Sequence, residues 1–267
     1  MKQLDTKLMH PADQITVVIS RIYRSGLTTT SGGNISIKDE NGDIWITPGG
    51  IDKGSLTPKD IICVKPDGTI IGPHKPSSEF PFHKAIYEMR PKMTAVIHAH
   101  PPALVSFSIT HQIPNTNIIP QAKRVCGKIG FAPYDVPGSQ GLGQKIAAEF
   151  KNHPDYKAVI MENHGVVLCG EDLMDAYQRF ETLEFCARTV INAKTLGEPT
   201  YLTDEQIDSF YDLAEAWANG DMVMLDADAL EGVGPAGVDH NVRLTVTGAA
   251  TAEENGEYTV TVEASRS

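Results

Sequence analysis

Apolar residues along the first 220 positions recur in two periods, and segments of the two kinds alternate along the chain. A period of three to four residues is typical of amphipathic helices, whereas alternation at every second residue, or a short continuous apolar run, indicates a strand. Helices are therefore expected over about 11–25, 79–90, 103–109, 142–150, 173–193 and 203–219, and strands over 35–37, 44–46, 61–64, 95–97, 158–161 and 166–168. Residues 111–141 are rich in Pro, Gly and Asn, and their pattern predicts no element.

Turn signals indicate how these elements are connected. Asn41-Gly42 separates the strands over 35–37 and 44–46, and this dipeptide is a strong signal for a β-hairpin. Helices and strands otherwise interleave along the chain. The combination favours an α/β layered fold with a largely antiparallel central sheet.

The pattern changes after Gly220. Glycines, a proline and scattered acidic residues between 221 and 240 indicate a linker. Residues 244–247 and 258–262 each alternate, and Glu254-Asn255-Gly256 lies between them, so the two segments could pair as a hairpin. We therefore expect a main domain over 1–220 and a C-terminal extension over 221–267, whose role the sequence does not indicate.

Charge and composition exclude several classes of partner. The net charge of −11 argues against binding to nucleic acid or to an acidic membrane surface, although local donors could still hold a small anionic substrate. The four cysteines are far apart and indicate reduced thiols rather than a disulfide framework. No apolar run approaches the ~20 residues needed to span a bilayer, and residues 1–12 contain no apolar signal core. We expect a soluble, cytoplasmic protein.

Two histidines follow the apolar strand over 95–97. His98 and His100 are two residues apart, so on a strand their side chains point to the same face, and Pro101 and Pro102 end the strand there. Paired imidazoles at a strand end suit a divalent metal, most often zinc. An equally good interpretation of this pair alone is two hydrogen-bonded histidines beside a core strand.

A third candidate ligand is His164, in the connection Glu162–Gly165 between two apolar strands. A sheet brings distant strands together, so this imidazole could reach His98 and His100. Taken alone, His164 is better interpreted as a turn residue. Its occurrence in the same chain as the His98-x-His100 pair favours a metal ligand.

Glu79 also has two interpretations. It follows Ser77 and Ser78 at the start of a predicted helix, which is an ordinary capping sequence. The same N–H groups and hydroxyls bind phosphate well, and the carboxylate would then face both a phosphate ester and a metal. His83 lies one turn further along, so Glu79 and His83 form a rival metal pair, less well formed than His98-x-His100.

Two glycine loops next to predicted strands could bind an anion. They are Ser31–Asn34 and Thr47–Gly50, and each offers backbone N–H groups. Neither matches a P-loop or a dinucleotide-binding fingerprint.

The order of five motifs resembles the class II aldolase/adducin family, and within it most resembles the L-fuculose-1-phosphate aldolases. The motifs are Ser31–Ser36, Ile46–Ile51, Pro76–Glu79, His98–His100 and Glu162–Gly165, and the resemblance extends over about residues 10–218. It implies a three-layer α/β/α fold, one Zn²⁺ ion per subunit, and a ring-like homotetramer with active sites between subunits.

The resemblance also implies roles for individual residues. His98, His100 and His164 match the zinc ligands, and Glu79 matches a carboxylate that acts as acid/base and can touch the metal. The positions that match the phosphate site are Gly33, Asn34, Gly49, Gly50, Ser77 and Ser78. Gly49 departs from the family, which often has a hydroxyl residue there. Trp217 falls near the position of a tyrosine that closes over a neighbour's site, so Trp217 is the candidate lid, although a tryptophan in a helix is more often a core residue.

The function implied is cleavage of a ketose 1-phosphate, with L-fuculose 1-phosphate as the expected substrate, into dihydroxyacetone phosphate and L-lactaldehyde through a zinc-stabilised ene-diolate. One alternative is an L-ribulose-5-phosphate 4-epimerase, but those enzymes typically carry aspartate at the position of Glu79. Glutamate favours an aldolase, or a related lyase acting on a phosphorylated sugar or sugar acid. The other alternative is a non-catalytic, adducin-like interaction protein, against which the complete set of histidines and Glu79 argues.

Overall fold

The computed structural model describes residues 8–219, 242–246, 251–252, 258–259 and 262–266. The chain divides into two compact units, Met1–Phe210 and Tyr211–Ser267. The division falls within the helix α7 (Asp204–Ala218). A domain boundary after residue 220 stays a prediction.

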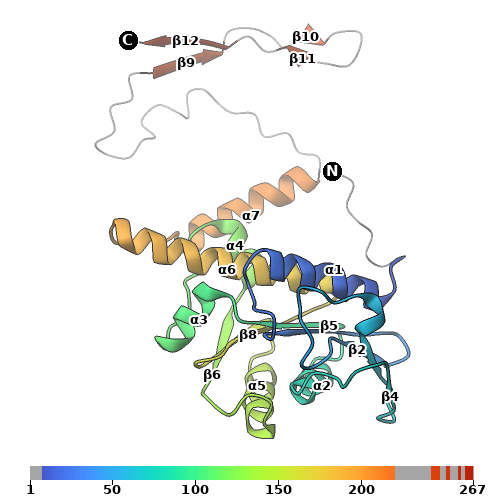
Figure 1. Cartoon of the computed structure of the whole chain (residues 1–267). Coiled ribbons are helices and arrows are strands. Elements are labelled where there is room, and N and C mark those ends of the chain that lie inside the picture. Colours follow the sequence, from blue (N-terminus) through green and yellow to red (C-terminus); the bar gives the residue numbers. More distant parts are fainter. Residues whose placement is uncertain (1–7, 220–241, 247–250, 253–257, 260–261, 267) are drawn as a thin grey trace. The chain divides into compact units, whose positions relative to one another are not determined.

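An eight-stranded sheet forms the centre of the first unit, in the order β4-β3-β2-β1-β5-β8-β7-β6 (Figure 1). The strands are β1 (Asn34–Lys38), β2 (Ile44–Ile46), β3 (Ile62–Val64), β4 (Ile70–Ile71), β5 (Ala95–Ala99), β6 (Ile129–Ala132), β7 (Ala158–Met161) and β8 (Gly165–Gly170). Every neighbouring pair is antiparallel except β6 with β7. The predicted largely antiparallel sheet is therefore confirmed.

Helices cover both faces of this sheet (Figure 1). One face packs against α1 (Pro11–Arg24), α3 (Pro102–Ile109), α4 (Pro120–Cys126) and α6 (Leu173–Leu196). The other face packs against α2 (Phe80–Met89) and α5 (Gln140–Asn152). The unit therefore has the expected three-layer α/β/α architecture.

The alternation of β5 places the candidate site between layers. Ala95, Ile97 and Ala99 belong to the core on the α1/α6 side, whereas Val96 belongs to the core on the α2/α5 side. Because successive strand residues point to opposite faces, His98 shares the face of Val96. His98 therefore points toward the layer that contains α2, and Glu79 begins that helix.

The elements that periodicity did not predict are short. Within residues 111–141 the structure has α4 and β6, and it adds β4 and a 3₁₀ helix over Pro58–Asp60. The helix α4 has seven residues and β6 has four, too few for a clear period. Their position is decided by packing on α6 and by pairing with β7.

The second unit contains two short antiparallel pairs. β9 (Val242–Val246) pairs with β12 (Val262–Arg266), and β10 (Thr251–Ala252) pairs with β11 (Tyr258–Thr259). Within the described residues, the expected pairing of 244–247 with 258–262 is found only at Val246 with Val262, because 244–245 pair with 263–264 and 258–259 pair with 251–252. Positions 247, 260 and 261 lie outside the described residues. None of the helices in the described part of the chain has the length and apolarity needed to cross a bilayer.

Candidate metal centre and active site

His98 is held in one orientation by the sheet. It is fully buried, pairs with Asn34 of β1 and Val167 of β8, and its Nδ1 donates to the carbonyl of Val166 over 2.9 Å. In neutral imidazole only one ring nitrogen carries a proton, so a donating Nδ1 leaves a lone pair on Nε2. That Nε2 is directed into the site.

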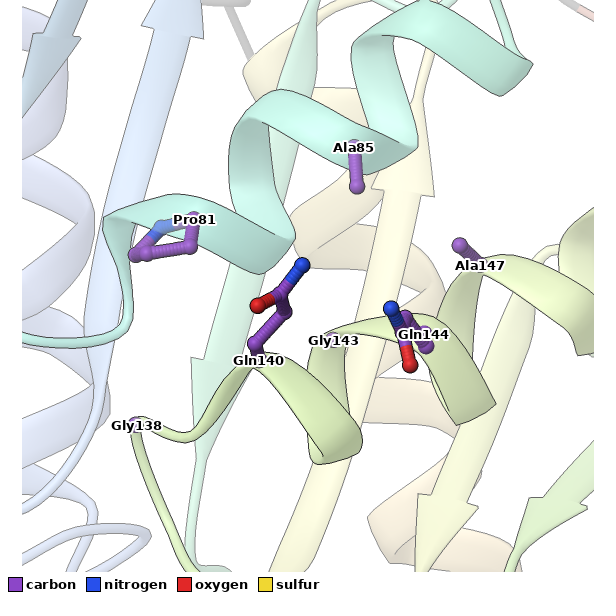
Figure 2. Close-up of a pocket in the computed structure, with 7 residues that line it drawn as sticks. All are labelled: Pro81, Ala85, Gly138, Gln140, Gly143, Gln144 and Ala147. Carbon is purple, nitrogen blue, oxygen red and sulfur yellow. The ribbon is translucent and has the colours of Figure 1, made fainter.

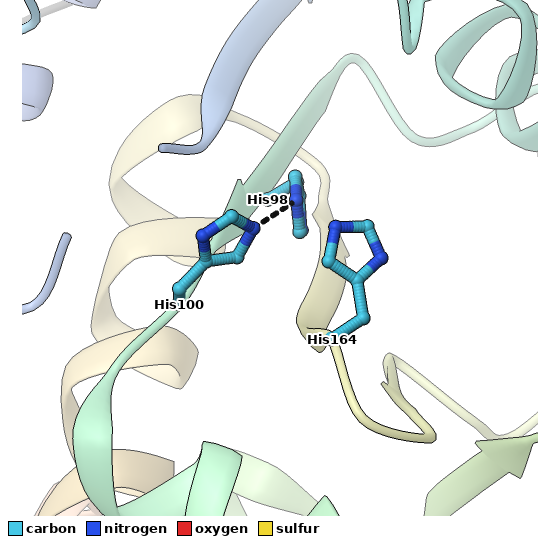
Figure 3. Close-up of side chains that lie close together, drawn as sticks. All are labelled: His98, His100 and His164. Atoms are coloured by element: carbon cyan, nitrogen blue, oxygen red, sulfur yellow. Dashed lines mark hydrogen bonds between the residues drawn. The ribbon is translucent and has the colours of Figure 1, made fainter. Parts of the chain in front are cut away.

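His100 and His164 bring two more imidazoles to the same point (Figure 3). The Nε2 atoms of His98 and His100 are 3.0 Å apart, and His164 comes from the turn between β7 and β8. Asn163 in that turn has φ of 52°, a left-handed conformation that asparagine tolerates better than most residues. One ring nitrogen from each of the three histidines lies within 4.8 Å of the others. The structure therefore brings together the three predicted ligands.

Two glycines allow the imidazoles to approach so closely. A Cβ on Gly165 would lie 2.4 Å from the carbonyl oxygen of Ala99 and 2.9 Å from Cδ2 of His100. A Cβ on Gly32 would lie 2.8 Å from Nδ1 of His100. Both glycines therefore leave space that the ring of His100 requires.

Glu79 adds a carboxylate to this cluster. Its Oε2 lies 3.2 Å from Nε2 of His98, and its Oε1 lies 3.4 Å from Nε2 of His164. Glu79 occupies the N-cap position of α2, yet its side chain does not cap the helix. Of the two interpretations open from the sequence, the structure thus places the carboxylate beside the histidines.

The electrostatics of the cluster suit a cation. Burial, followed by the neighbouring histidines, lowers the pKa of His100 to about 3, and burial with His98 lowers the pKa of His164 to about 4, so both are neutral near pH 7. Burial by itself raises the pKa of Glu79, but the electrostatic effect of the neighbouring His98 and His164 and the hydrogen bond from Asn34 outweigh it, and that pKa falls below its ordinary value.

The donor set fits a divalent metal. The lone pair on Nε2 of His98 is directed at Nε2 of His100 and at a carboxylate oxygen of Glu79, over 3.0 and 3.2 Å. A ring nitrogen lone pair and a carboxylate oxygen at 3.2 Å repel each other, and a cation between them would remove that repulsion. Three imidazoles with an optional carboxylate are a common ligand set for catalytic zinc.

The candidate phosphate-binding loops lie close together. A Cβ on Gly49 would be 3.3 Å from the carbonyl oxygen of Pro76 and 3.7 Å from the backbone nitrogen of Ser78, while Ser77 donates its N–H to the carbonyl of Thr47. Gly33 and Gly50 have φ of 72° and 71°, which favours glycine. A phosphate site formed by these residues stays a prediction.

Asn34 has a different environment from the other phosphate candidates. Its side chain is buried, Nδ2 donates to Oε2 of Glu79 over 2.7 Å, and Oδ1 accepts from His83. His83 in turn has its other ring nitrogen against Ser36, so neither of its nitrogens faces the three-histidine cluster. The rival pair of Glu79 and His83 is thus not assembled as a metal site.

The polar partners of His83 were missed by sequence reasoning. Nδ1 of His83 lies 2.7 Å from the hydroxyl of Ser36, which in turn lies 2.7 Å from the hydroxyl of Tyr87. A signal was present, because Glu79, His83 and Tyr87 recur every four residues and therefore share one face of α2. Polar groups repeated on the buried face of a helix indicate a buried network.

Trp217 belongs to α7, but its side chain lies outside the described residues, so the lid role stays a prediction. A hollow of about 590 Å³ lies between α2 and α5 (Figure 2) and contains none of the predicted site residues. Its lining consists of Pro81, Ala85, Gly138, Gln140, Gly143, Gln144 and Ala147, none of which is charged.

Comparison with known sequences gives a consistent set of relatives. The profile of the family described as "Class II Aldolase and Adducin N-terminal domain" matches residues 13–191. A 5-deoxy-D-ribulose 1-phosphate aldolase of Bacillus thuringiensis is 30% identical, over 76% of this chain and 94% of the relative. A 3-oxo-tetronate 4-phosphate decarboxylase of Escherichia coli K12 is 31% identical, over 67% of this chain and 84% of the relative. An L-fuculose phosphate aldolase of Methanocaldococcus jannaschii is 36% identical, over 67% of this chain and 95% of the relative.

Solved structures agree with this comparison. An L-fuculose 1-phosphate aldolase superposes with a TM-score of 0.67 at 28% identity, covering 77% of this chain and 96% of that chain. A sugar-phosphate aldolase from Thermotoga maritima superposes with a TM-score of 0.62 at 26% identity, covering 71% of this chain and 97% of that chain.

Proposed function

Given that the chain belongs to the class II aldolase and adducin family, we propose that it is a zinc-dependent aldehyde-lyase that cleaves a ketose 1-phosphate. The observation that carries the proposal is the contact of Glu79 with two of three clustered imidazoles, 3.2 Å from His98 and 3.4 Å from His164. A cluster of neutral imidazoles holds a divalent metal, and an adjacent carboxylate can move a proton.

His98, His100 and His164 would hold the zinc ion. The chemistry that a bound zinc ion supplies is Lewis-acid stabilisation of negative charge on the carbonyl and hydroxyl oxygens of the substrate. No lysine Schiff base is then required for the cleavage.

Glu79 is the proposed acid/base. In cleavage, the hydroxyl on the carbon that becomes the aldehyde loses its proton, the carbon–carbon bond breaks, and its electron pair stays on the carbon next to the carbonyl. Glu79 delivers a proton to that carbon, and the proton lost by the hydroxyl balances the one delivered. In the condensation direction, Glu79 removes the same proton. A positioned acid/base of this kind contributes typically about 10²–10⁴ in rate.

The phosphate group is assigned to the glycine loops and the start of α2. Ser77, Ser78 and the backbone N–H groups of Gly33, Gly49 and Gly50 would hold it, and this distant binding would orient the reacting carbons. Close approach of Gly49 to Ser78 supports the assignment. L-fuculose 1-phosphate is the first substrate to test, with dihydroxyacetone phosphate and L-lactaldehyde as products.

A second candidate function is decarboxylation of a phosphorylated 3-oxo sugar acid. It is favoured by relatives named 3-oxo-tetronate 4-phosphate decarboxylase, at 31% identity in Escherichia coli and 33% in Haemophilus influenzae. Decarboxylation of a 3-oxo acid also breaks a carbon–carbon bond and leaves an electron pair next to a carbonyl. The same metal and the same proton donor would therefore serve both reactions.

The deciding experiment is a substrate panel on the purified full-length protein of known metal content. Release of dihydroxyacetone phosphate is measured from L-fuculose 1-phosphate and 5-deoxy-D-ribulose 1-phosphate, and release of CO₂ from 3-oxo-tetronate 4-phosphate. Epimerisation of L-ribulose 5-phosphate is measured as well, and each assay is run with and without chelator. Chelator-sensitive cleavage of a ketose 1-phosphate supports the aldolase. CO₂ release alone selects the decarboxylase, and turnover of L-ribulose 5-phosphate alone selects the 4-epimerase.

We propose that the protein is a homotetramer with active sites between subunits, because the family resemblance implies this assembly. Light scattering should then give four times the 29.0 kDa of one chain.

The alternative to an enzyme is a non-catalytic, adducin-like interaction protein. Purified protein that contains no metal and has no activity on any substrate of the panel would favour it.

A further inference from the structure

A line of five buried polar side chains runs between β1 and α2 and ends at the carboxylate of Glu79. The hydroxyl of Tyr87 is 2.7 Å from that of Ser36, and Ser36 is 2.7 Å from Nδ1 of His83. Nε2 of His83 is 2.5 Å from Oδ1 of Asn34, and Nδ2 of Asn34 is 2.7 Å from Oε2 of Glu79. None of the five residues is more than 8% exposed.

The carboxylate determines the direction of every hydrogen bond in this line. An ionised carboxylate only accepts, so Asn34 must present its NH₂ group to Glu79 and its carbonyl oxygen to His83. Nε2 of His83 must then carry the proton that bonds to Asn34.

The same reasoning continues to the far end of the line. Full burial, followed by His98, lowers the pKa of His83 to about 3, so the ring is neutral and its Nδ1 has a lone pair. Ser36 therefore donates to His83, and Tyr87 donates to Ser36. All four hydrogen bonds donate toward Glu79.

The two oxygens of Glu79 consequently differ. Oε2 accepts from Asn34 and contacts His98. Oε1 is buried without a hydrogen-bond partner and faces His164 at 3.4 Å. Oε1 is thus the oxygen that remains free to exchange a proton with a substrate.

We propose that His83 is a positioning residue: its Nε2–H keeps the Asn34 amide nitrogen on Oε2 of Glu79, which leaves Oε1 as the proton-carrying oxygen. Without that donor the Asn34 amide can turn over and present its oxygen to the carboxylate, which then moves away. The inference rests on the proposed role of Glu79 as acid/base.

Two substitutions at one position separate this role from simple filling of the core. His83→Gln places an amide nitrogen near the position of Nε2 and can still donate to Asn34. His83→Asn reaches only the position of Nδ1 and Ser36, so the donor to Asn34 is lost. Both variants carry a side-chain amide. His83→Gln keeps the hydrogen bond to Asn34, whereas His83→Asn keeps only the contact with Ser36.

The expected result is a separation of kcat from KM. His83→Asn should lower kcat by about 10- to 100-fold, because small displacements of a reacting group have effects of this size, while KM and bound metal change by less than about threefold. His83→Gln should restore kcat to within about threefold of the wild-type value. Equal kcat in His83→Asn and the wild-type protein, or equal losses in both variants, would overturn the inference.

A measurement without turnover tests the same point. In protein labelled with ¹⁵N-histidine, with and without chelator, the signal that His83→Gln removes should show a protonated Nε2 and an unprotonated Nδ1. The opposite tautomer overturns the inference, whether or not the protein is active. The expected tautomer in a protein inactive on the whole panel supports the hydrogen-bond line and removes the proposed function instead.

Discussion

Among single residues, Glu79 shows how a local sequence pattern and a tertiary position can differ in meaning. Ser-Ser-Glu is an ordinary start for a helix, and Glu79 does occupy the N-cap of α2. Its carboxylate nonetheless lies against His98 and His164 and accepts from Asn34. The buried position and these partners are the reason to assign it chemistry rather than capping.

Removing the charge of Glu79 should remove most of the turnover without removing the metal. Glu79→Gln keeps the size of the side chain and leaves the three histidines in place, so one metal ion per chain should remain. We expect kcat to fall by about 10²–10⁴, the usual contribution of a general acid/base. Steady-state assays with metal analysis check this outcome, and full turnover in the variant would exclude Glu79 from proton transfer.

Gly165 is the second residue whose identity matters at this scale. Gly165→Ala would place a Cβ 2.4 Å from the carbonyl oxygen of Ala99 and 2.9 Å from the ring of His100. We expect a loss of about 1–3 kcal/mol in the free energy of unfolding, the usual effect of overpacking, together with weaker zinc binding. Denaturant titration and competition with a zinc chelator measure the two effects.

Gly143 supplies the matched control. It lies in α5, and a Cβ there would be 3.7 Å from Phe82, an ordinary contact. Gly143→Ala should therefore leave zinc binding unchanged and raise the free energy of unfolding by up to about 1 kcal/mol, because alanine favours helices. A control as damaging as Gly165→Ala would show that the close approach at Gly165 is not the cause.

At the scale of secondary-structure elements, α6 holds the segment that follows His100. The carboxylate of Glu184 in α6 is buried and accepts the N–H groups of Ala103 and Leu104 in the first turn of α3, over 3.2 and 3.1 Å. Pro101 at the N-cap makes no side-chain cap of its own. A residue from a distant helix thus caps α3, only three residues after His100.

Removal of this cap should destabilise the protein. Glu184→Ala leaves two buried N–H groups without an acceptor, and each unsatisfied group costs about 1–3 kcal/mol. We expect a lower denaturation midpoint and weaker zinc binding, because the backbone next to His100 loosens. Glu181→Ala, at an exposed site on the same helix, removes one hydrogen bond from Tyr177 and should cost no more than about 1.5 kcal/mol, well below the loss from two unsatisfied N–H groups. Similar losses from both substitutions would contradict the capping role.

At the scale of the whole molecule, the metal centre links segments that are far apart in the chain. His98 and His100 come from β5 and the residue after it, whereas His164 comes from the turn before β8. The three nitrogens meet only when β5 and β8 are paired. Metal binding should therefore stabilise the folded state by linkage.

Thermal unfolding with and without metal tests this coupling. Free zinc at about 100 times its Kd should add about 2.7 kcal/mol to stability, and a chelator should lower Tm accordingly. His164→Ala should remove most of the metal-dependent change in Tm, because it removes one of the three imidazoles. An undiminished metal response in that variant would place the zinc elsewhere.

Local patterns were sufficient for the longer elements and for the candidate ligands. Each helix or strand that was predicted depends on the period of contiguous residues, and His98, His100 and His164 follow or join apolar strands. The family resemblance supplied the three layers, and the packing of helices on both faces of the sheet confirmed them. Short elements such as α4 and β6 were not predicted, because too few residues carry their period and packing decides their place.

The amino-acid sequence by itself determined which residue types stand at the strand ends and on the core face of α2, since periodicity is a property of neighbouring residues. Only the tertiary structure decided their partners. Asn34 contacts Glu79 and His83 across 45 and 49 residues of chain, and those contacts depend on how α2 packs against β1. The physical reason is that hydrogen-bond direction is set by the group at the far end of a contact, here a carboxylate that can only accept.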